Sequence, residues 1–312
     1  MNSPRFGHCI SRREFLGKSL VATSLAAAAP SSCFSAEAAA KFSSPIVVFS
    51  KVYQELKLNF DEAARLTAEV GLDGVDCPVR AGGEVLPEKA KEELPRYVEA
   101  LRKHNLGMHL VTTGITSSTS SYAEEVLAAA KKAGARYYRF GFIERKKDVP
   151  VAKQLDEIKG ELKGLAALNA KVGIGGMLQN HSPSGHAYIG GDLSELYELV
   201  KDFDPAQIGV AFDIGHALVV HGDGWREHFE RLKTHLRVAY VKDVKREGRW
   251  VRFGQGELGE TGYFKLLREM NYSAPISLHI EFDWSNKGKE KTRAVLADAL
   301  KESAAELRKW LA

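Results

Sequence analysis

The stretch Gln207-Ile208-Gly209-Val210-Ala211-Phe212-Asp213-Ile214-Gly215-His216 decides the fold of this chain. Its apolar part predicts a strand that is buried on both faces, as in a parallel sheet covered by helices. Asp213 stands at the carboxyl end of that strand, where α/β sheets and barrels place their ligands, and His216 can turn back to the same point. A plainer interpretation stays open, in which Asp213 caps the next helix and His216 is an ordinary loop residue.

Composition narrows the class of protein. The 312 residues are 44% hydrophobic and 27% charged with a net charge of +4, which suits a globular protein with one large core. The charge forms no basic stripe of the kind that binds nucleic acid. The chain also has no apolar run of eighteen residues, so we expect no stable membrane anchor.

Residues 1–40 are typical of an export signal rather than of a fold. Arg12-Arg13 precede an apolar run from Leu20 to Ala29, and small residues such as Ala38-Ala39-Ala40 offer a cleavage site. The pattern predicts a twin-arginine signal and a periplasmic protein, with an uncleaved anchor or a chance arginine pair as the alternatives. Cleavage would leave Cys77 as the remaining cysteine, so the mature protein would have no internal disulfide. Because this pathway exports folded proteins, it also hints at a bound metal.

Short apolar runs alternate with amphipathic stretches from residue 41 to residue 312. Eight strand–helix units of this length predict a single (β/α)₈ TIM barrel. A doubly wound open sheet is the competitor, but Ser50-Lys51-Val52-Tyr53 after the first strand is not a glycine-rich phosphate turn. We expect strands at 46–49, 74–77, 106–111, 136–140, 172–178, 208–212, 238–241 and 276–280, and helices at 61–70, 94–104, 121–133, 151–170, 193–201, 225–232, 263–270 and 289–311.

Polar side chains crowd the predicted strand ends, which meet at one mouth in a barrel. The ends of the last four strands are the richest in such residues. In chain order the candidates are Arg80, His109 to Thr113, Arg139, Gln179-Asn180-His181, Asp213, His216, Tyr240, Lys242, Asp243, His279, Glu281 and Asp283.

These segments resemble the sugar isomerase/epimerase group with the xylose-isomerase-like barrel, over most of residues 45–312. The segments that carry the resemblance are Leu178-Gln179-Asn180-His181, Asp213-Ile214-Gly215-His216, Val241-Lys242-Asp243, Gly254-Gln255-Gly256-Glu257-Leu258 and Ile276-Ser277-Leu278-His279-Ile280-Glu281. The resemblance implies a divalent metal held by Glu, Asp, His and Glu at the ends of strands five to eight. The matching residues are Gln179, Asp213, Tyr240 and Glu281, of which only Asp213 and Glu281 keep the family type.

The departures from the family pattern change the chemistry that we expect. In the family pattern the metal polarises a sugar carbonyl while two carboxylates exchange the adjacent proton. Gln179 is no base, although its amide oxygen can bind a hard cation together with Asp213 and Glu281. Such a ligand set favours Mg²⁺ or Mn²⁺ over Zn²⁺. We therefore predict Glu281 as the base, Lys242 as the stabiliser of a developing oxyanion, and His216 as a third catalytic group.

Five further side chains are predicted to contact the substrate: His181, Tyr240, Arg80, His109 and Trp284. Three of them have an alternative interpretation that needs no ligand. His181 can be a surface histidine, Arg80 can pair with a nearby acid, and Trp284 can simply cover the barrel top.

Three functions are compatible with this pattern. The first is a metal-assisted isomerase or epimerase that removes the proton next to a sugar carbonyl. The second is a lyase or hydratase acting on 3-keto-glycosides, which needs one base and one acid and so tolerates the loss of a carboxylate. The third is a non-catalytic sugar-binding barrel. In each case the partner is a small carbohydrate, and a homo-oligomer is compatible with the sequence. The first function requires Asp213 and Glu281 to share a cation across the barrel mouth.

Overall fold

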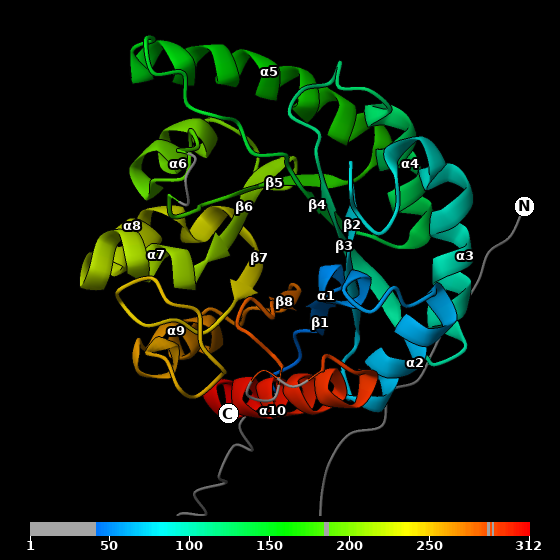
Figure 1. Cartoon of the computed structure of the whole chain (residues 1–312). Coiled ribbons are helices and arrows are strands. Elements are labelled where there is room, and N and C mark those ends of the chain that lie inside the picture. Colours follow the sequence, from blue (N-terminus) through cyan, green and yellow to red (C-terminus); the bar gives the residue numbers. More distant parts are fainter. Residues whose placement is uncertain (1–41, 184–186, 286–287, 289) are drawn as a thin grey trace, which may run out of the picture. The chain divides into compact units, whose positions relative to one another are not determined.

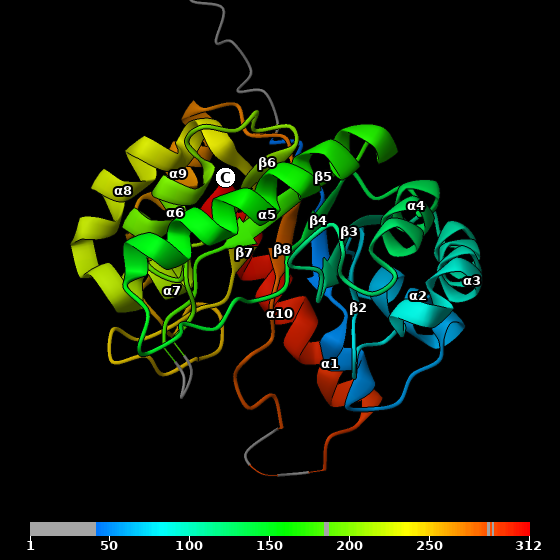
Figure 2. The ribbon, with the colours of Figure 1, turned by 90° about the horizontal axis from the view of Figure 1, so that it is seen from above.

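The structure is a computed structural model, and it describes residues 42–183, 187–285, 288 and 290–312. Eight parallel strands form a closed barrel in the order β1 to β8, with helices around them (Figures 1 and 2). The predicted (β/α)₈ barrel is therefore confirmed. The strands are β1 Ile46–Phe49, β2 Gly74–Val79, β3 Gly107–Thr113, β4 Tyr137–Arg139, β5 Gly175–Gln179, β6 Ile208–Asp213, β7 Leu236–Val241 and β8 Ile276–Leu278. The predicted export signal lies outside the described residues.

The helices form an outer layer, and several have clear sequence signals at their ends. Asn59 and Glu62 form a capping box at the start of α2, while Gly134 and Gly173 end α4 and α5 in the left-handed conformation. Among the described residues no helix is both long and apolar enough to cross a membrane. The α-helices are α1 Lys51–Gln54, α2 Phe60–Glu69, α3 Ala90–Arg102, α4 Ala123–Ala133, α5 Val151–Val172, α6 Leu193–Val200, α7 Ile214–His221, α8 Trp225–Leu232, α9 Tyr263–Glu269 and α10 Arg293–Leu311.

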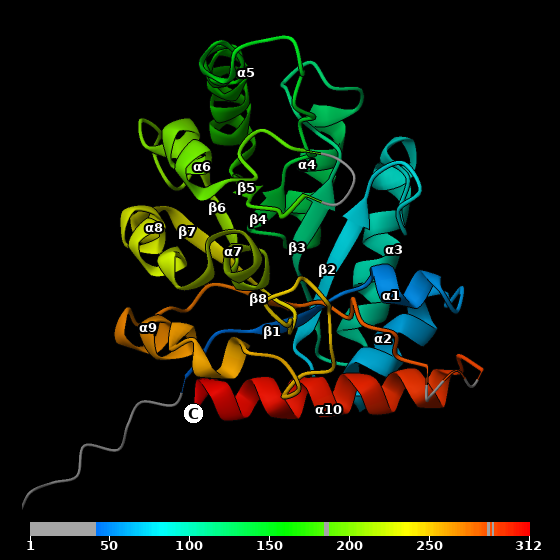
Figure 3. The same cartoon turned by 60° about the vertical axis from the view of Figure 1, so that its left-hand side comes forward.

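The last helix, α10, packs where the first and the last units of the barrel meet. Figure 3 shows α10 lying along the side of the barrel that carries β1, α2 and α9. Arg293 and Lys301 of α10 form ion pairs with Glu69 at the end of α2, at 2.7 and 3.6 Å. Trp310 of α10 packs against Phe264 of α9, with ring centroids 5.1 Å apart. The ring of helices is thus closed where the ring of strands is closed by the pairing of β1 with β8.

Helix α7 was not predicted, and it begins directly at the end of β6. Asp213 is its N-cap, because the Asp213 carboxylate accepts a hydrogen bond from the His216 backbone N–H at 3.1 Å. The capping interpretation of Asp213 is therefore correct. It does not remove Asp213 from the mouth of the barrel, since the same carboxylate also contacts side chains from β5 and from the end of β7.

The loop after β7 is organised by Asp243. The Asp243 carboxylate accepts backbone N–H bonds from Gly254, Gly256 and Leu258 at 2.8–3.3 Å. A side chain at Gly256 would place its Cβ 2.0 Å from Asp243 Oδ1, so only glycine fits there. The motif from Gly254 to Leu258 therefore shapes the loop, and that loop carries Trp250 to the mouth.

Beneath the mouth, Asp76 of β2 is fully buried. Its carboxylate accepts hydrogen bonds from Thr112 and Ser277 at 2.8 and 2.9 Å. Burial nevertheless raises the pKa of Asp76 to about 6. Asp76 is thus protonated more readily in the folded protein than in the unfolded chain.

We expect the stability of the protein to fall as the pH rises through 6, in part because of Asp76. Its folded pKa lies above its unfolded value of 3.8, so the contribution is present below that value and is lost as Asp76 ionises. A shift of this size corresponds to roughly 3 kcal/mol. Asp76→Asn should flatten the profile from about pH 4 to a little above pH 6, the interval between the two pKa values, measured as the free energy of unfolding in urea. A mutant with the wild-type pH slope would contradict this prediction.

Candidate active site

A cavity of about 440 Å³ opens at the carboxyl ends of the strands. Its lining includes residues from the ends of β1 to β8, as expected for a barrel of this type. Most of these side chains carry charge, an imidazole ring or an aromatic ring. They are Phe49, Lys51, Arg80, Thr112, Arg139, Phe142, Gln179, His181, Ser182, Pro183, His216, Val219, Lys242, Glu247, Gly248, Trp250, His279 and Glu281.

Asp213 has no exposed surface and is not itself part of the lining, but it contacts two residues that are, Gln179 and Lys242. Its Oδ2 accepts a hydrogen bond from Gln179 Nε2 at 3.0 Å and lies 3.0 Å from Lys242 Nζ. Asn180 fixes the strand end, because its side-chain amide exchanges two hydrogen bonds with the Asp213 backbone. The structure therefore brings Gln179, Asp213 and Lys242 together.

The residues present do not fit a divalent cation in this arrangement. The Lys242 ammonium already balances the charge of Asp213, and Gln179 turns an N–H rather than its oxygen toward the carboxylate. Glu281 pairs with Lys51 and approaches His279 rather than completing a ligand set with Asp213. In the described part of the chain, no group of three or more His, Cys, Asp or Glu side chains is placed to hold a metal ion.

Three histidines around Lys242 are held in the neutral form. Burial and the Lys242 charge lower the pKa of His181, and they lower the pKa values of His216 and His279 strongly. Ser182 Oγ lies 2.7 Å from His216 Nδ1, which leaves His216 Nε2 buried without a hydrogen-bond partner among the described residues. His279 Nε2 is likewise buried without a hydrogen-bond partner among the described residues. Buried polar atoms are normally hydrogen-bonded, and a hydroxyl group of a bound substrate would supply the missing bond.

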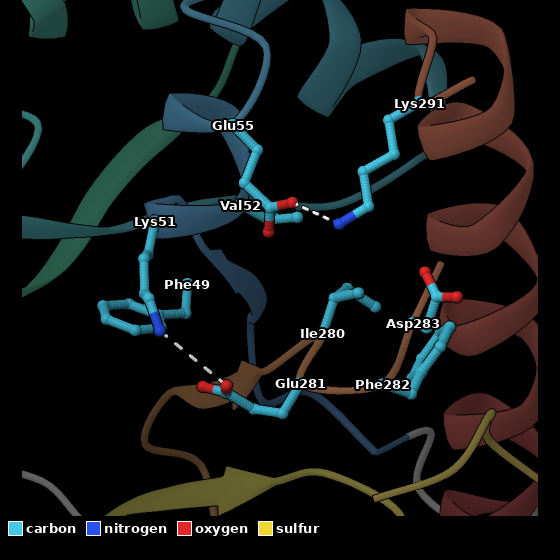
Figure 4. A pocket seen from close by; sticks show the side chains of 9 residues that line it. All are labelled: Phe49, Lys51, Val52, Glu55, Ile280, Glu281, Phe282, Asp283 and Lys291. Carbon is cyan, nitrogen blue, oxygen red and sulfur yellow. Dashed lines mark hydrogen bonds and ion pairs between the residues drawn. The ribbon is translucent and has the colours of Figure 1, made fainter. Parts of the chain in front are cut away.

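Glu281 lies between the main cavity and a second cavity of about 250 Å³. Figure 4 shows it facing Lys51, with its Oε2 3.8 Å from Lys51 Nζ. Phe49, Lys51 and Glu281 line both cavities, so the two spaces adjoin at this ion pair. A second ion pair, between Glu55 and Lys291 at 2.6 Å, borders the smaller cavity.

The structure does not bring every predicted residue to the main cavity. His109 is the third residue of β3, and its Nε2 lies 3.3 Å from the Asp73 carbonyl at the amino end of the barrel. Trp284 is buried, with Lys291 Nζ 4.8 Å from its ring centre, and is outside the cavity lining. Tyr240 packs inside the barrel with Met177. His181, His216 and Arg80 do line the cavity.

Several lining residues were not assigned a role from the sequence, among them Lys51, Arg139 and Trp250. Lys51 begins α1, with one residue between it and the end of β1, and the convergence of strand ends would have identified it. Arg139 ends β4 and was noted only as a polar strand end. Trp250 comes from the loop after β7, where its ring lies 4.9 Å from both the His216 ring and Lys242 Nζ. No sequence signal marks Trp250.

Solved structures with similar folds include several sugar enzymes. The 3-keto-D-glucoside 4-epimerase YcjR of E. coli is 15% identical, with a TM-score of 0.66 over 85% of this chain and 99% of that one. The IolI protein with a bound zinc atom is also 15% identical, with a TM-score of 0.65 over 86% and 98%. The probable 3-DHS dehydratase AsbF of Bacillus anthracis is 14% identical, with a TM-score of 0.62 over 83% and 97%. At these identities the likeness establishes the fold alone.

A search of curated proteins gives no match to this sequence. The model of the xylose isomerase-like TIM barrel family matches residues 64–311, which are most of the chain and include every strand end of the cavity beyond β1. The resemblance drawn from the strand-end motifs is thereby confirmed, and this chain belongs to the xylose isomerase-like TIM barrel family.

Proposed function

We propose that this protein is an isomerase- or epimerase-like enzyme that removes the proton next to the carbonyl of a sugar or sugar-derived ketone. The observation that carries the proposal is the lining of the main cavity. It combines the Glu281 carboxylate with two neutral imidazoles, His216 and His279, whose Nε2 atoms have no hydrogen-bond partner among the described residues. A carboxylate can accept the proton, and the imidazoles can bind hydroxyl groups.

In the proposed reaction Glu281 takes the proton from the carbon next to the carbonyl. The electron pair of the broken C–H bond forms the carbon–carbon double bond of an enediolate, and the carbonyl oxygen becomes negatively charged. Lys242 lies in the lining and supplies positive charge to that oxygen. The proton of the adjacent hydroxyl then moves to the negatively charged oxygen, and Glu281 returns the carbon-bound proton to the former carbonyl carbon. The carbonyl now stands on the neighbouring carbon, which completes an isomerisation with one base.

An epimerisation needs a proton donor on the opposite face of the enediolate. Gln179 is an amide and cannot fill this role. His216 is the candidate in this structure, because its ring lines the cavity and its buried Nε2 has no hydrogen-bond partner among the described residues, with Asp213 Oδ2 at 3.8 Å. Because the imidazole is neutral, its N–H would give the proton, and solvent would return a proton to His216 and take up the one held by Glu281. No step of the proposed reaction is assigned to the divalent cation that the sequence led us to expect, because Lys242 already lies against Asp213.

Solvent hydrogen exchange tests the proposal directly. In D₂O, the protein should introduce deuterium next to the carbonyl of a keto sugar, and NMR detects the loss of that proton signal. Free ketohexoses and 3-keto-glucose form the panel. We expect exchange to persist after treatment with a chelator. Absence of exchange across the panel would favour the third hypothesis, a sugar-binding barrel without catalysis.

Lyase chemistry on 3-keto-glycosides is the second candidate function. The adjoining smaller cavity favours it, since a leaving group attached to the reacting ring would have a space beyond Glu281. Elimination breaks the C2–H bond and the C1–O bond, and the departing oxygen takes up a proton. Release of the free aglycone from a 3-keto-glucoside would identify this reaction, whereas an altered configuration without release would identify the epimerase.

A further inference from the structure

We propose that Arg139 and Arg80 bind a carboxylate of the substrate, so that the enzyme acts on a sugar acid rather than a neutral sugar. The inference concerns the same cavity as the proposed function and rests on it for the reaction. The binding site itself follows from the charges around Arg139.

Arg139 is a buried cation without an acid partner. The side chain ends β4, is 3% exposed and lines the main cavity. Among the described residues no carboxylate lies within 4.0 Å of it, and its hydrogen bond goes to the Phe140 carbonyl. A guanidinium has five N–H donors, so this arrangement leaves donors for a ligand.

The surroundings of Arg139 disfavour its charge. Burial and the nearby Arg80 lower the pKa of Arg139 to about 10, which still leaves it charged near neutral pH. Asp76 is the acid whose charge raises the pKa of Arg139, but its carboxylate accepts its hydrogen bonds from Thr112 and Ser277. An uncompensated buried cation is costly, and an anionic ligand relieves that cost.

Arg80 adds a second guanidinium to the same cavity. It follows β2, is half-buried and lies 5.9 Å from the ring centre of Phe49. It likewise has no ion pair with a described carboxylate. The two lysines of the lining differ, because Lys242 pairs with Asp213 and Lys51 with Glu281. The two arginines are therefore the cations of the lining that have no carboxylate at ion-pair distance among the described residues.

The geometry favours a carboxylate at one end of the substrate. A guanidinium presents parallel N–H donors that match a planar carboxylate, and the Phe142 ring, 4.4 Å from the Arg139 guanidinium carbon, holds that plane. In the closed barrel, β4 and β8 lie opposite each other in strand order. A substrate anchored by Arg139 would thus extend across the mouth toward Glu281.

Titration calorimetry with D-glucose, D-glucuronate and D-glucose 6-phosphate tests the inference without turnover. The wild type should bind glucuronate at least tenfold more tightly than glucose. Arg139→Met should remove that preference, Arg139→Lys should keep part of it, and Arg80→Met should weaken it. Arg136→Met is the matched control, because Arg136 is exposed and just precedes the same strand, and it should bind as the wild type does.

The thermal midpoint of Arg139→Met separates loss of the site from loss of the fold. Removal of an uncompensated buried cation should leave that midpoint unchanged or higher. Equal binding of glucose and glucuronate by the wild type would overturn the inference, and tighter binding of the phosphate ester would overturn the assignment to a carboxylate. If the protein exchanges deuterium into a neutral keto sugar but does not bind glucuronate, the carboxylate site is wrong and the proposed reaction stands. If glucuronate binding requires Arg139 but no keto sugar or keto acid exchanges, the proposed reaction is wrong and the carboxylate site stands.

Discussion

Glu281→Gln is expected to lower turnover by a factor of about 10²–10⁴ while leaving the fold intact, because it removes the proposed base and keeps the shape of the side chain. The residue is partly exposed to the cavities, and the loss of its pairing with Lys51 across 3.8 Å should cost little stability. Single-turnover kinetics and deuterium exchange measure the first effect, and circular dichroism monitors the fold.

Glu247→Gln is the matched control for this substitution. Glu247 lines the same cavity but forms its ion pair with Arg249, at 3.2 Å. Its replacement should leave turnover within a few-fold of the wild type. A fully active Glu281→Gln protein would remove Glu281 from any essential role and with it the proposed reaction.

Lys242→Met should destabilise the protein by about 3–5 kcal/mol, since it leaves the fully buried Asp213 carboxylate without its counterion. The double variant Asp213→Asn with Lys242→Met should recover much of that loss, because it removes both charges. Urea denaturation of the four proteins in this cycle gives the coupling between the two side chains.

An exposed ion pair supplies the comparison for Lys242. Lys103 lies 2.8 Å from Asp61 on the surface, and Lys103→Met should cost no more than about 1 kcal/mol. If Lys242→Met cost as little stability as Lys103→Met, the ion pair with Asp213 would not stabilise the folded protein. The conclusion that Lys242 takes the place of a divalent cation beside Asp213 would then have to be abandoned.

The barrel could be predicted from the sequence because its signals are local and repeated. Each buried strand is a short apolar run, and glycine ends several of the intervening helices. The position of Asp213 followed from the same rule, since a charged residue directly after a buried strand lies at the mouth. Helix α7 escaped prediction because its cap is Asp213 itself, which the sequence pattern had assigned to the site.

The pairings within the site could not be predicted in the same way. Lys242 is two residues beyond Tyr240, and the strand pattern alone does not show that its ammonium reaches Asp213 rather than the substrate. His109 was misplaced because the predicted strand 106–111 stopped short of Thr113, where β3 ends, so that His109 was counted with the strand end although it is the third residue of the strand. Trp284 was expected at the cavity, but a large aromatic ring after β8 gains as much from burial elsewhere.

The closure of the ring by β8 and α10 has a consequence for folding during synthesis on the ribosome. β1 pairs with β2 on one side, but its other edge is paired by β8, and among the described residues the ion-pair partners of Glu69 lie in α10. A ribosome adds about 5–20 residues each second, so the first strand waits many seconds for the segment that completes its neighbourhood. During that interval the nascent barrel is an open sheet with two unpaired edges, which is the stage at which a chaperone would be of most use to it.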